Sequence, residues 1–312
     1  MPKARKLTVL GAGSVGATIA YTLVLQGMVS EIILVDVNKN SALGEAADII
    51  QGTPLVSPVR LSSGEYEDAA DSDIVIFALG LRRKPGMTRL DLFSANVDIL
   101  RNVVPAITRY APDAIYIVVS NPVDLLTYAV QKISGLPANR VIGSGTLLDT
   151  CRLRTVLSER TGVSTASIHA YVLAEHGDTS FIPWSLASIF GMNAVDYVRQ
   201  MGNETGPGWK EEILDDVRKA GARVIANKGA TFFAVSLSVC EICRNILGNT
   251  KRIMPVGKVL EGECGLSGAC VSLPYAIGAQ GLTGSVFPNF SPDEQAALEK
   301  SVESLKPYCQ TI

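Results

Sequence analysis

The sequence is poor in histidine and nearly balanced in charge. Only two of its 312 residues are histidine, His169 and His176. Histidine is the side chain whose ordinary pKa permits proton transfer near neutral pH. Acid–base chemistry by an imidazole would therefore fall to one of these two residues, and the rest of the sequence has to indicate which.

No basic excess is present. The chain has 28 Lys and Arg against 30 Asp and Glu, a formal net charge of -2 and a pI near 5.8. A protein without a basic stripe lacks the usual electrostatic footprint of nucleic-acid binding. We therefore expect no nucleic acid among its partners.

The cysteines are few and do not form a framework. They are scattered along the chain, and the Cys240-x-x-Cys243 pair lies in an apolar, helix-like run with no second ligand pair. We expect no metal site and predict reduced, buried thiols, as in a cytosolic protein. The six are Cys151, Cys240, Cys243, Cys264, Cys270 and Cys309.

A long hydrophobic run occurs only near the N-terminus. Residues 7–25 follow Lys3, Arg5 and Lys6 and superficially resemble a signal peptide. Three glycines interrupt the run, which continues into a second strand-like segment, residues 31–36. No other segment is long and apolar enough to span a membrane. The sequence predicts a soluble, cytoplasmic protein with no membrane partner.

Short apolar runs alternate with amphipathic segments through the first half of the chain. This alternation predicts an α/β fold, a Rossmann-type doubly wound parallel sheet. The expected strands are residues 7–10, 32–35, 59–61, 74–79 and 115–119, with helices at 41–50 and 95–110.

The organisation changes after a glycine-rich stretch at residues 143–146. The second half predicts an α+β domain, and the absence of a long linker predicts a packed seam between the halves. We place a first domain at residues 1–145 and a second at 146–312. Strand-like pieces are expected near residues 167–173, 254–260 and 268–273, with helices at 209–227, 230–247 and 292–305.

A G-x-G-x-x-G pattern lies between the first predicted strand and a helix. An aspartate, Asp36, follows Gly16 by twenty residues, at the end of the second strand. Such glycines let a pyrophosphate approach a helix N-terminus, and the acidic residue accepts hydrogen bonds from the ribose, which favours NAD over NADP. The alternative is a structural turn with an exposed aspartate. The candidate cofactor residues are Gly11, Gly13, Ser14, Val15, Gly16 and Asp36.

Further polar residues follow the strands of this sheet. The basic segment 81–89 follows the fourth strand, where its cations would face an anionic substrate or form an ordinary solvated turn. Asn121 ends the next strand and would present an amide to the same crevice. Asp149 and Arg152 lie three residues apart and so share a helix face. Asp149 would hold an imidazole in one orientation and Arg152 would bind a substrate carboxylate. The alternative is a simple ion pair between the two.

Taken in order, these motifs resemble the NAD-dependent L-lactate/malate dehydrogenase family over nearly the whole chain. The resemblance rests on the glycine loop with Asp36 and on the segments 88–92, 121–124, 143–149 and 175–178. It implies His176 as the proton donor and acceptor, Asp149 as its partner and Arg152 as the clamp on the substrate's C1 carboxylate. It further implies that Arg89 polarises the carbonyl and that Asn121 contacts cofactor and substrate.

The resemblance leaves the substrate between pyruvate and oxaloacetate. Arg83 stands where the malate enzymes carry an arginine, which can pair with a second carboxylate. The segment 143–146 and Thr231, which narrows the pocket in lactate enzymes, favour lactate. We predict an L-lactate dehydrogenase, with malate dehydrogenase as the alternative and a non-catalytic NAD-binding sensor as a remote one. NAD-dependent glycosidases are disfavoured because their metal-binding Cys/His cluster is missing.

The second histidine suggests regulation. Arg154 and His169 fall where bacterial lactate dehydrogenases of this family bind fructose 1,6-bisphosphate across a subunit interface. The alternative for His169 is an ordinary half-buried strand residue. The resemblance implies a homodimer or homotetramer of the bacterial type, with a small 2-oxo or 2-hydroxy acid as its substrate.

Overall fold

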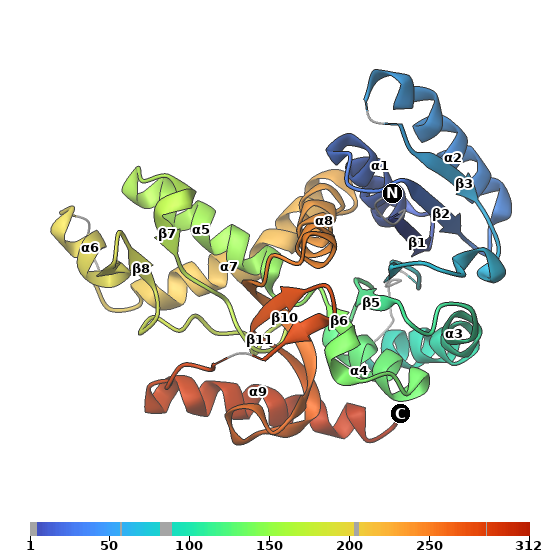
Figure 1. Cartoon of the computed structure of the whole chain (residues 1–312). Helices are drawn as coiled ribbons and strands as arrows, with labels where there is room; N and C mark the ends of the chain where they lie inside the picture. The colour runs from blue at the N-terminus through green and yellow to red at the C-terminus, as the bar shows by residue number, and fades with distance from the viewer. Residues whose placement is uncertain (1–4, 57, 82–88, 203–205, 285) are drawn as a thin grey trace.

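A nine-stranded sheet runs through the centre of the computed structural model (Figure 1), in the order β12-β11-β10-β6-β5-β4-β1-β2-β3. The structure describes residues 5–56, 58–81, 89–202, 206–284 and 286–312. For residues 89 and 90 it describes the main chain but not the side chains. The strands are β1 (Lys6–Leu10), β2 (Glu31–Val35), β3 (Arg60–Ser63), β4 (Ile74–Phe77), β5 (Ile115–Val118), β6 (Val141–Gly143), β10 (Arg252–Glu261), β11 (Ser267–Gly278) and β12 (Gly281–Thr283).

The first six strands are parallel, and the predicted doubly wound sheet is confirmed. Strands β4 and β5 are buried along their whole length, because helices cover both faces of a parallel sheet. The helices of this half are α1 (Ser14–Gln26), α2 (Lys39–Gly52), α3 (Arg89–Tyr110) and α4 (Val123–Ser134).

The antiparallel strands β10, β11 and β12 extend this sheet instead of forming one of their own. Strand β10 pairs with β6 where Gly257 lies opposite Gly143. A Cβ on Gly143 would lie 2.7 Å from the Thr127 hydroxyl of α4, so glycine at this position lets the helix lie close to β6. The two halves of the chain are therefore joined within one continuous sheet, which gives the packed boundary that the sequence predicts.

The helices of the second half are α5 (Leu147–Thr161), α6 (Ala194–Gln200), α7 (Trp209–Lys228), α8 (Phe233–Gly248) and α9 (Pro292–Cys309). Helix α8 packs against α1, and the Cys240 thiol lies 3.7 Å from the Ile19 carbonyl. Ring contacts between Phe93 and Tyr308 bring the C-terminal end of α9 to α3, as Figure 1 shows.

A second, smaller core lies in the lobe formed by α5, α6, α7 and a three-stranded sheet, at the left of Figure 1. That sheet contains β7 (Ile168–His169), β8 (Ser188–Ile189) and β9 (Met192–Asn193). The strand expected over residues 167–173 is therefore too long. Beyond β7 the chain crosses to the large sheet, where Ala174 exchanges backbone hydrogen bonds with Ser272 of β11.

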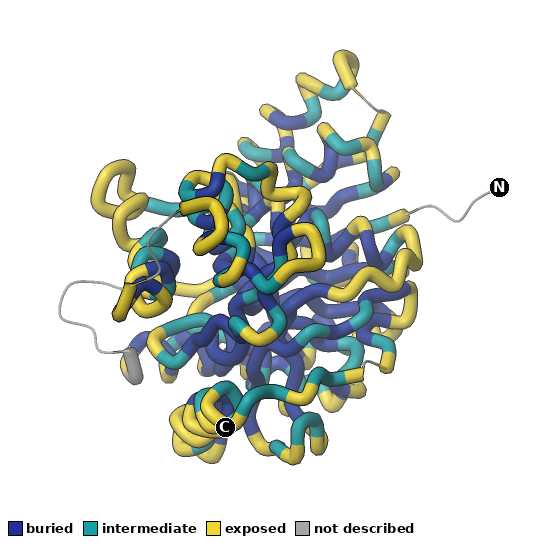
Figure 2. Tube along the Cα trace, turned by 90° about the vertical axis from the view of Figure 1, so that its left-hand side faces the viewer, coloured by how far each residue is buried: buried dark blue, intermediate teal, exposed yellow. Residues whose placement is uncertain are grey.

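The large core occupies both sides of the nine-stranded sheet (Figure 2). All six cysteines are free, and Cys240, Cys243, Cys270 and Cys309 are buried as predicted. Burial raises the pKa of Cys240 and of Cys309 to about 12, so these thiols stay protonated. The prediction of burial is wrong for Cys151, which is exposed, and Cys264 is only partly buried. None of the described helices is both long and apolar enough to cross a membrane.

Candidate active site

The glycine loop lies between β1 and α1, as the sequence predicts. Gly11 has a φ of +98°, and a Cβ there would lie 2.6 Å from the Ala78 carbonyl oxygen. A Cβ on Gly16 would lie 1.8 Å from the Gly11 oxygen. These two positions need glycine for the turn and for close packing of helix against strand.

Gly13 differs from its two neighbours in the motif. Apart from its two chain neighbours, no described residue has an atom within 4 Å of its ideal Cβ position, and as the N-cap residue it makes no side-chain hydrogen bond to α1. The loop thus leaves open space at a helix N-terminus, where backbone N–H groups and the helix dipole favour a phosphate. The fit to a dinucleotide pyrophosphate is good.

Asp36 lies directly after β2 and beside this loop. Its carboxylate accepts hydrogen bonds from the backbone N–H of Ala12 at 2.7 Å and of Asn38 at 2.8 Å. The side chain is partly exposed. A carboxylate fixed at this strand end is suitably placed for ribose hydroxyls.

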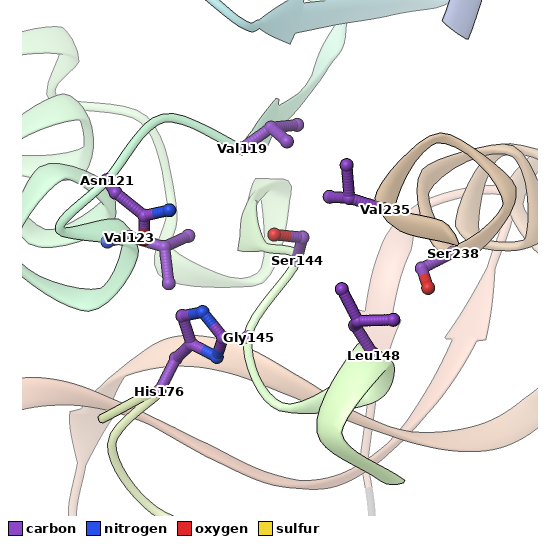
Figure 3. Close-up of a pocket in the computed structure, with 9 residues that line it drawn as sticks. All are labelled: Val119, Asn121, Val123, Ser144, Gly145, Leu148, His176, Val235 and Ser238. Atoms are coloured by element: carbon purple, nitrogen blue, oxygen red, sulfur yellow. Dashed lines mark hydrogen bonds between the residues drawn. The ribbon is translucent and has the colours of Figure 1, made fainter. Parts of the chain in front are cut away.

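A small pocket opens where the ends of β5 and β6 meet α8 (Figure 3). The imidazole of His176 points into it, with Asn121 and Val123 to one side and Leu148 to the other. The lining residues are Val119, Asn121, Val123, Ser144, Gly145, Leu148, His176, Val235 and Ser238. Sequence reasoning assigned no role to Val119, Val123, Val235 or Ser238, which are ordinary apolar or small residues of strand, helix and loop patterns.

The three central residues of the prediction lie together. Nδ1 of His176 is 2.5 Å from Oδ2 of Asp149, and Arg152 donates a hydrogen bond of 2.8 Å to the other oxygen, Oδ1. The side chains of Asp149, Arg152 and His176 are 8%, 19% and 26% exposed. One buried carboxylate therefore orients both the imidazole and the guanidinium, and Nε2 of the ring is the nitrogen left to face the pocket.

The ionisation of His176 and Asp149 is coupled. Burial disfavours the imidazolium, but the charge and hydrogen bond of Asp149 outweigh it and hold the pKa of His176 above its ordinary value. Burial likewise opposes ionisation of Asp149, yet His176 and then Arg152 hold the pKa of that carboxyl below its usual range. The site favours a protonated imidazole beside an ionised carboxylate.

The loop that carries His176 is fastened at both ends. The Ser301 hydroxyl of α9 accepts a hydrogen bond from the Glu175 N–H and lies 2.8 Å from the Thr179 hydroxyl. Arg218 of α7 donates to the hydroxyl and the carbonyl oxygen of Ser180. Neither anchor was predicted, because both lie far from the loop in sequence.

Ala174 precedes this loop with a φ of +73°, in the left-handed region that favours glycine. The residue is fully buried, and its two hydrogen bonds to Ser272 hold the conformation. The chain thus enters the loop of His176 at a fixed angle.

Asn96 of α3 is a further residue that the sequence did not indicate. Its side chain accepts a hydrogen bond from the Leu81 N–H at 2.7 Å and donates one to the Asn121 carbonyl oxygen at 3.1 Å. The buried amide thereby links the segments that follow β4 and β5. It positions the main chain of Asn121, which lines the pocket.

Two predicted residues cannot be placed in the site. Arg83 lies outside the described residues, and of Arg89 only the main chain is described, as the first residue of α3. Thr231 is partly buried just before α8, the helix that contributes Val235 and Ser238 to the pocket, but it does not itself line the pocket.

The candidate effector residues lie apart from the pocket. Arg154 donates from Nε to the Ala170 carbonyl oxygen at 3.1 Å and lies over the Tyr171 ring at 5.2 Å. His169 is the exposed last residue of β7, adjacent to Ala170. The main-chain oxygen that Arg154 contacts thus belongs to the residue that follows His169 in the chain. Among the described residues, no cluster of three or more His, Cys, Asp or Glu is placed to hold a metal ion.

Comparison with known proteins covers nearly the whole chain. Residues 5–143 match the family model of the lactate/malate dehydrogenase NAD binding domain, and residues 146–312 match the model of the alpha/beta C-terminal domain. The L-lactate dehydrogenase of Acetivibrio thermocellus is 43% identical, over 99% of this chain and 97% of that protein. L-lactate dehydrogenase 1 of Clostridium acetobutylicum is 42% identical over the full length of both.

Solved structures agree with these matches. The minor L-lactate dehydrogenase of Enterococcus mundtii, in a ligand-bound form, has a TM-score of 0.95 and 36% identity, and the match covers 99% of this chain and 98% of that one. A lactate dehydrogenase from a deep-sea metagenome of the Medee basin has a TM-score of 0.93 and 34% identity, with 98% of each chain covered.

Proposed function

The chain belongs to the lactate/malate dehydrogenase family, and we propose that it reduces pyruvate to L-lactate as an L-lactate dehydrogenase. Members of this family are NAD-dependent oxidoreductases that act on a small 2-hydroxy acid, so an enzyme is favoured over a non-catalytic sensor. The relatives and the structural neighbours are named lactate dehydrogenases, and the malate alternative is not favoured. The observation that carries the proposal is the His176–Asp149 pair opening on a pocket.

In the proposed reaction each site residue has its own role. Protonated His176 donates a proton from Nε2 to the ketone oxygen, and Asp149 keeps the ring in one orientation and stabilises its charge. Arg152 binds the substrate carboxylate, since a guanidinium matches it in a planar, two-bond arrangement. Arg89 polarises the carbonyl, and Arg83 and Thr231 border the substrate.

The cofactor site follows from the glycine loop. Gly11, Gly13, Ser14, Val15 and Gly16 would hold the pyrophosphate, Asp36 the ribose and Asn121 the nicotinamide end. Bound NADH supplies the hydride. The apolar side chains Val119, Leu148 and Val235 line the pocket beside His176 and would exclude water from it.

Replacing His176 with Asn tests the acid–base assignment. We expect kcat for pyruvate reduction to fall by about 10² to 10⁴-fold, because the proton donor is lost. NADH affinity, measured by nicotinamide fluorescence, should stay unchanged. In the wild type, kcat/KM should be larger for pyruvate than for oxaloacetate. Near-normal turnover of the variant would refute the assignment, and a preference for oxaloacetate would refute the lactate proposal.

Several finer features belong to the same proposal. We place the domain boundary at residues 145 and 146, which the two matched family models support. A homodimer or homotetramer is supported by exposed apolar side chains on the adjacent helices α1 and α8, namely Tyr21, Leu25, Phe233 and Leu237. Six free cysteines agree with a cytoplasmic location.

Regulation by fructose 1,6-bisphosphate belongs to the same proposal and is supported by the exposed position of His169 at the end of β7 and by the bond of Arg154 to the next residue, Ala170. The sugar phosphate should raise wild-type activity, and Arg154→Ala should abolish this response. A wild type that does not respond would remove the effector from the proposal.

A further inference from the structure

The turn between α7 and α8 is bridged by the side chain of Lys228, the last residue of α7. Its ammonium lies 3.7 Å from the centre of the Phe232 ring and 4.1 Å from the centre of the Phe233 ring. The two rings meet edge to face, with centroids 4.5 Å apart. A cation at these distances is attracted by the negative faces of the rings, so one lysine holds two aromatic side chains on the far side of the turn.

The turn has few other restraints of its own. Gly229 ends α7 with a φ of +84°, and apart from its chain neighbours no described residue has an atom within 4 Å of its ideal Cβ position. Phe232, the N-cap residue of α8, makes no side-chain hydrogen bond to that helix. The contact of Lys228 with the two rings therefore restrains a turn that has an open glycine at one end and a helix start without a side-chain cap at the other.

The first turn of α8 connects this turn of the chain to the pocket. The Ser236 hydroxyl donates a hydrogen bond of 2.6 Å to the Phe232 carbonyl oxygen and lies 3.4 Å from the Val15 carbonyl oxygen in α1. Val235 lines the pocket (Figure 3). Thr231 belongs to the turn itself, and the function proposed above has it border the substrate.

Resting on that function, we infer that Lys228 is a positioning residue that limits the size of the substrate side chain. Its ammonium fixes Phe232, and Phe232 fixes the first turn of α8, so that Thr231 and Val235 keep their positions. A pocket wall that is held in place favours the methyl group of pyruvate over a longer alkyl group, because a wall that gives way leaves room for the extra carbon.

Loss of the charge tests this role. Lys228→Met removes the ammonium and keeps an unbranched side chain at an exposed position. We expect kcat/KM for pyruvate to fall about fivefold, as loss of an exposed cation–π contact predicts, mainly through a higher KM. The value of kcat should change little, because the His176–Asp149 pair is untouched. The ratio of kcat/KM for 2-oxobutanoate to that for pyruvate should rise by a similar factor.

Two further variants separate the ring contact from other effects of the charge. A lysine in the last turn also interacts with the negative end of the helix dipole, which needs no aromatic partner. Phe232→Leu removes the ring and leaves the charge, so we expect it to match Lys228→Met, and the double variant should lose no more than either single one. Lys228→Arg keeps a cation over the rings and should be close to wild type.

Lys210→Met is the matched control. Lys210 is the second residue of the same helix, and its ammonium lies 5.9 Å from the centre of the Trp184 ring, away from the turn. We expect its kinetic constants to be unchanged. Equal losses in the Lys210 and Lys228 variants would overturn the proposal, and so would a Lys228→Met enzyme with unchanged KM and an unchanged substrate ratio.

An NMR signal tests the contact without reference to activity. Ring currents of Phe232 and Phe233 should shift the ε-methylene protons of Lys228 upfield, and absence from Lys228→Met identifies the signal. Phe232→Leu should return it towards the ordinary lysine position. A wild type with no upfield lysine signal would overturn the proposal. A wild type that does not reduce pyruvate would refute the proposed function instead, while the NMR signal still decides whether Lys228 holds the turn.

Discussion

At the scale of single residues, Asp149 performs two tasks with its two oxygens. Oδ2 holds the His176 ring and Oδ1 holds the Arg152 guanidinium. The imidazole and the guanidinium, the proposed proton donor and carboxylate clamp, are thus fixed relative to one another by a single side chain that is 8% exposed. Because folding raises the pKa of His176 and lowers that of Asp149, the contribution of the pair to stability depends on pH.

Replacing Asp149 with Asn should reveal that dependence. The raised pKa of His176 gives stability that is present below the ordinary value of 6.5 and is lost as pH rises through the folded pKa. The lowered pKa of Asp149 gives stability that is present above its ordinary value of 3.8 and is lost as pH falls through the folded pKa. Between these limits we expect Asp149→Asn to lower the free energy of unfolding by roughly 2 kcal/mol.

Urea denaturation of wild type and variant at about pH 5.5 and about pH 9 measures the effect, and the difference should be smaller at the higher pH. Asp196→Asn is the control, because the Asp196–Arg199 pair is exposed and should contribute little at either pH. An Asp149→Asn effect of equal size at both pH values would contradict the expected coupling.

At the scale of elements, helix α7 contacts two parts of the site. Arg218 holds the loop of His176 through hydrogen bonds to Ser180. Gly221, one turn later, lies against the Arg152 guanidinium, and its ideal Cβ position is 3.4 Å from Nη2 of Arg152. Residues three apart share a helix face. Helix α7 therefore contacts both the loop that carries His176 and the side chain of Arg152, the two groups to which the proposal gives proton donation and carboxylate binding.

Arg218→Ala should separate these contacts. We expect kcat/KM to fall by about tenfold, because small displacements of a catalytic group are costly, and the free energy of unfolding to fall by roughly 1 kcal/mol. Arg218→Lys retains a donor for the Ser180 carbonyl oxygen and should recover part of the activity. Arg223→Ala, on the same helix but bonded to Asp216, should leave kcat/KM unchanged. Equal losses in the Arg218 and Arg223 variants would remove the special role of Arg218.

Elements with a strong local pattern could be predicted from the sequence, and others could not. The buried runs of β1, β2 and β5 are continuous and apolar, so their positions were predicted to within a residue or so. Helix α4 was not predicted, because it begins directly after Asn121 and Pro122, a pair that is typical of a turn. The two-residue strands β8 and β9 are too short to show a period, and they form only through pairing with β7.

The same distinction holds for the site. His176, Asp149 and Arg152 lie in segments whose order along the chain identifies them, and the structure brings them together. Ser301 and Arg218 carry no local signal, since their contacts to the loop arise only when α9 and α7 pack against it. Sequence therefore indicated the groups that react more readily than the groups that hold them in place.

At the scale of the whole molecule, the site lies where two hydrophobic cores meet. Asp149 and Arg152 belong to α5, whose Leu153 and Leu157 are buried in the smaller core. His176 follows Ala174, which belongs to the large core under the nine-stranded sheet. Loss of either core would separate the imidazole from its carboxylate.

The two tryptophans allow the cores to be followed separately. Trp184 and Trp209 both belong to the smaller core, with ring centroids 5.2 Å apart. That core has fewer buried residues and only two-residue strands, so we expect it to unfold at lower urea than the large sheet. Tryptophan fluorescence and activity should then be lost together, before the far-UV circular dichroism of the sheet.

A variant with its only tryptophan in the large core provides the control. It combines Trp184→Phe and Trp209→Phe with Tyr308→Trp, which places the fluorophore against Phe93. That signal should follow circular dichroism, whereas coincident transitions for all probes would show that the two cores unfold as one cooperative unit.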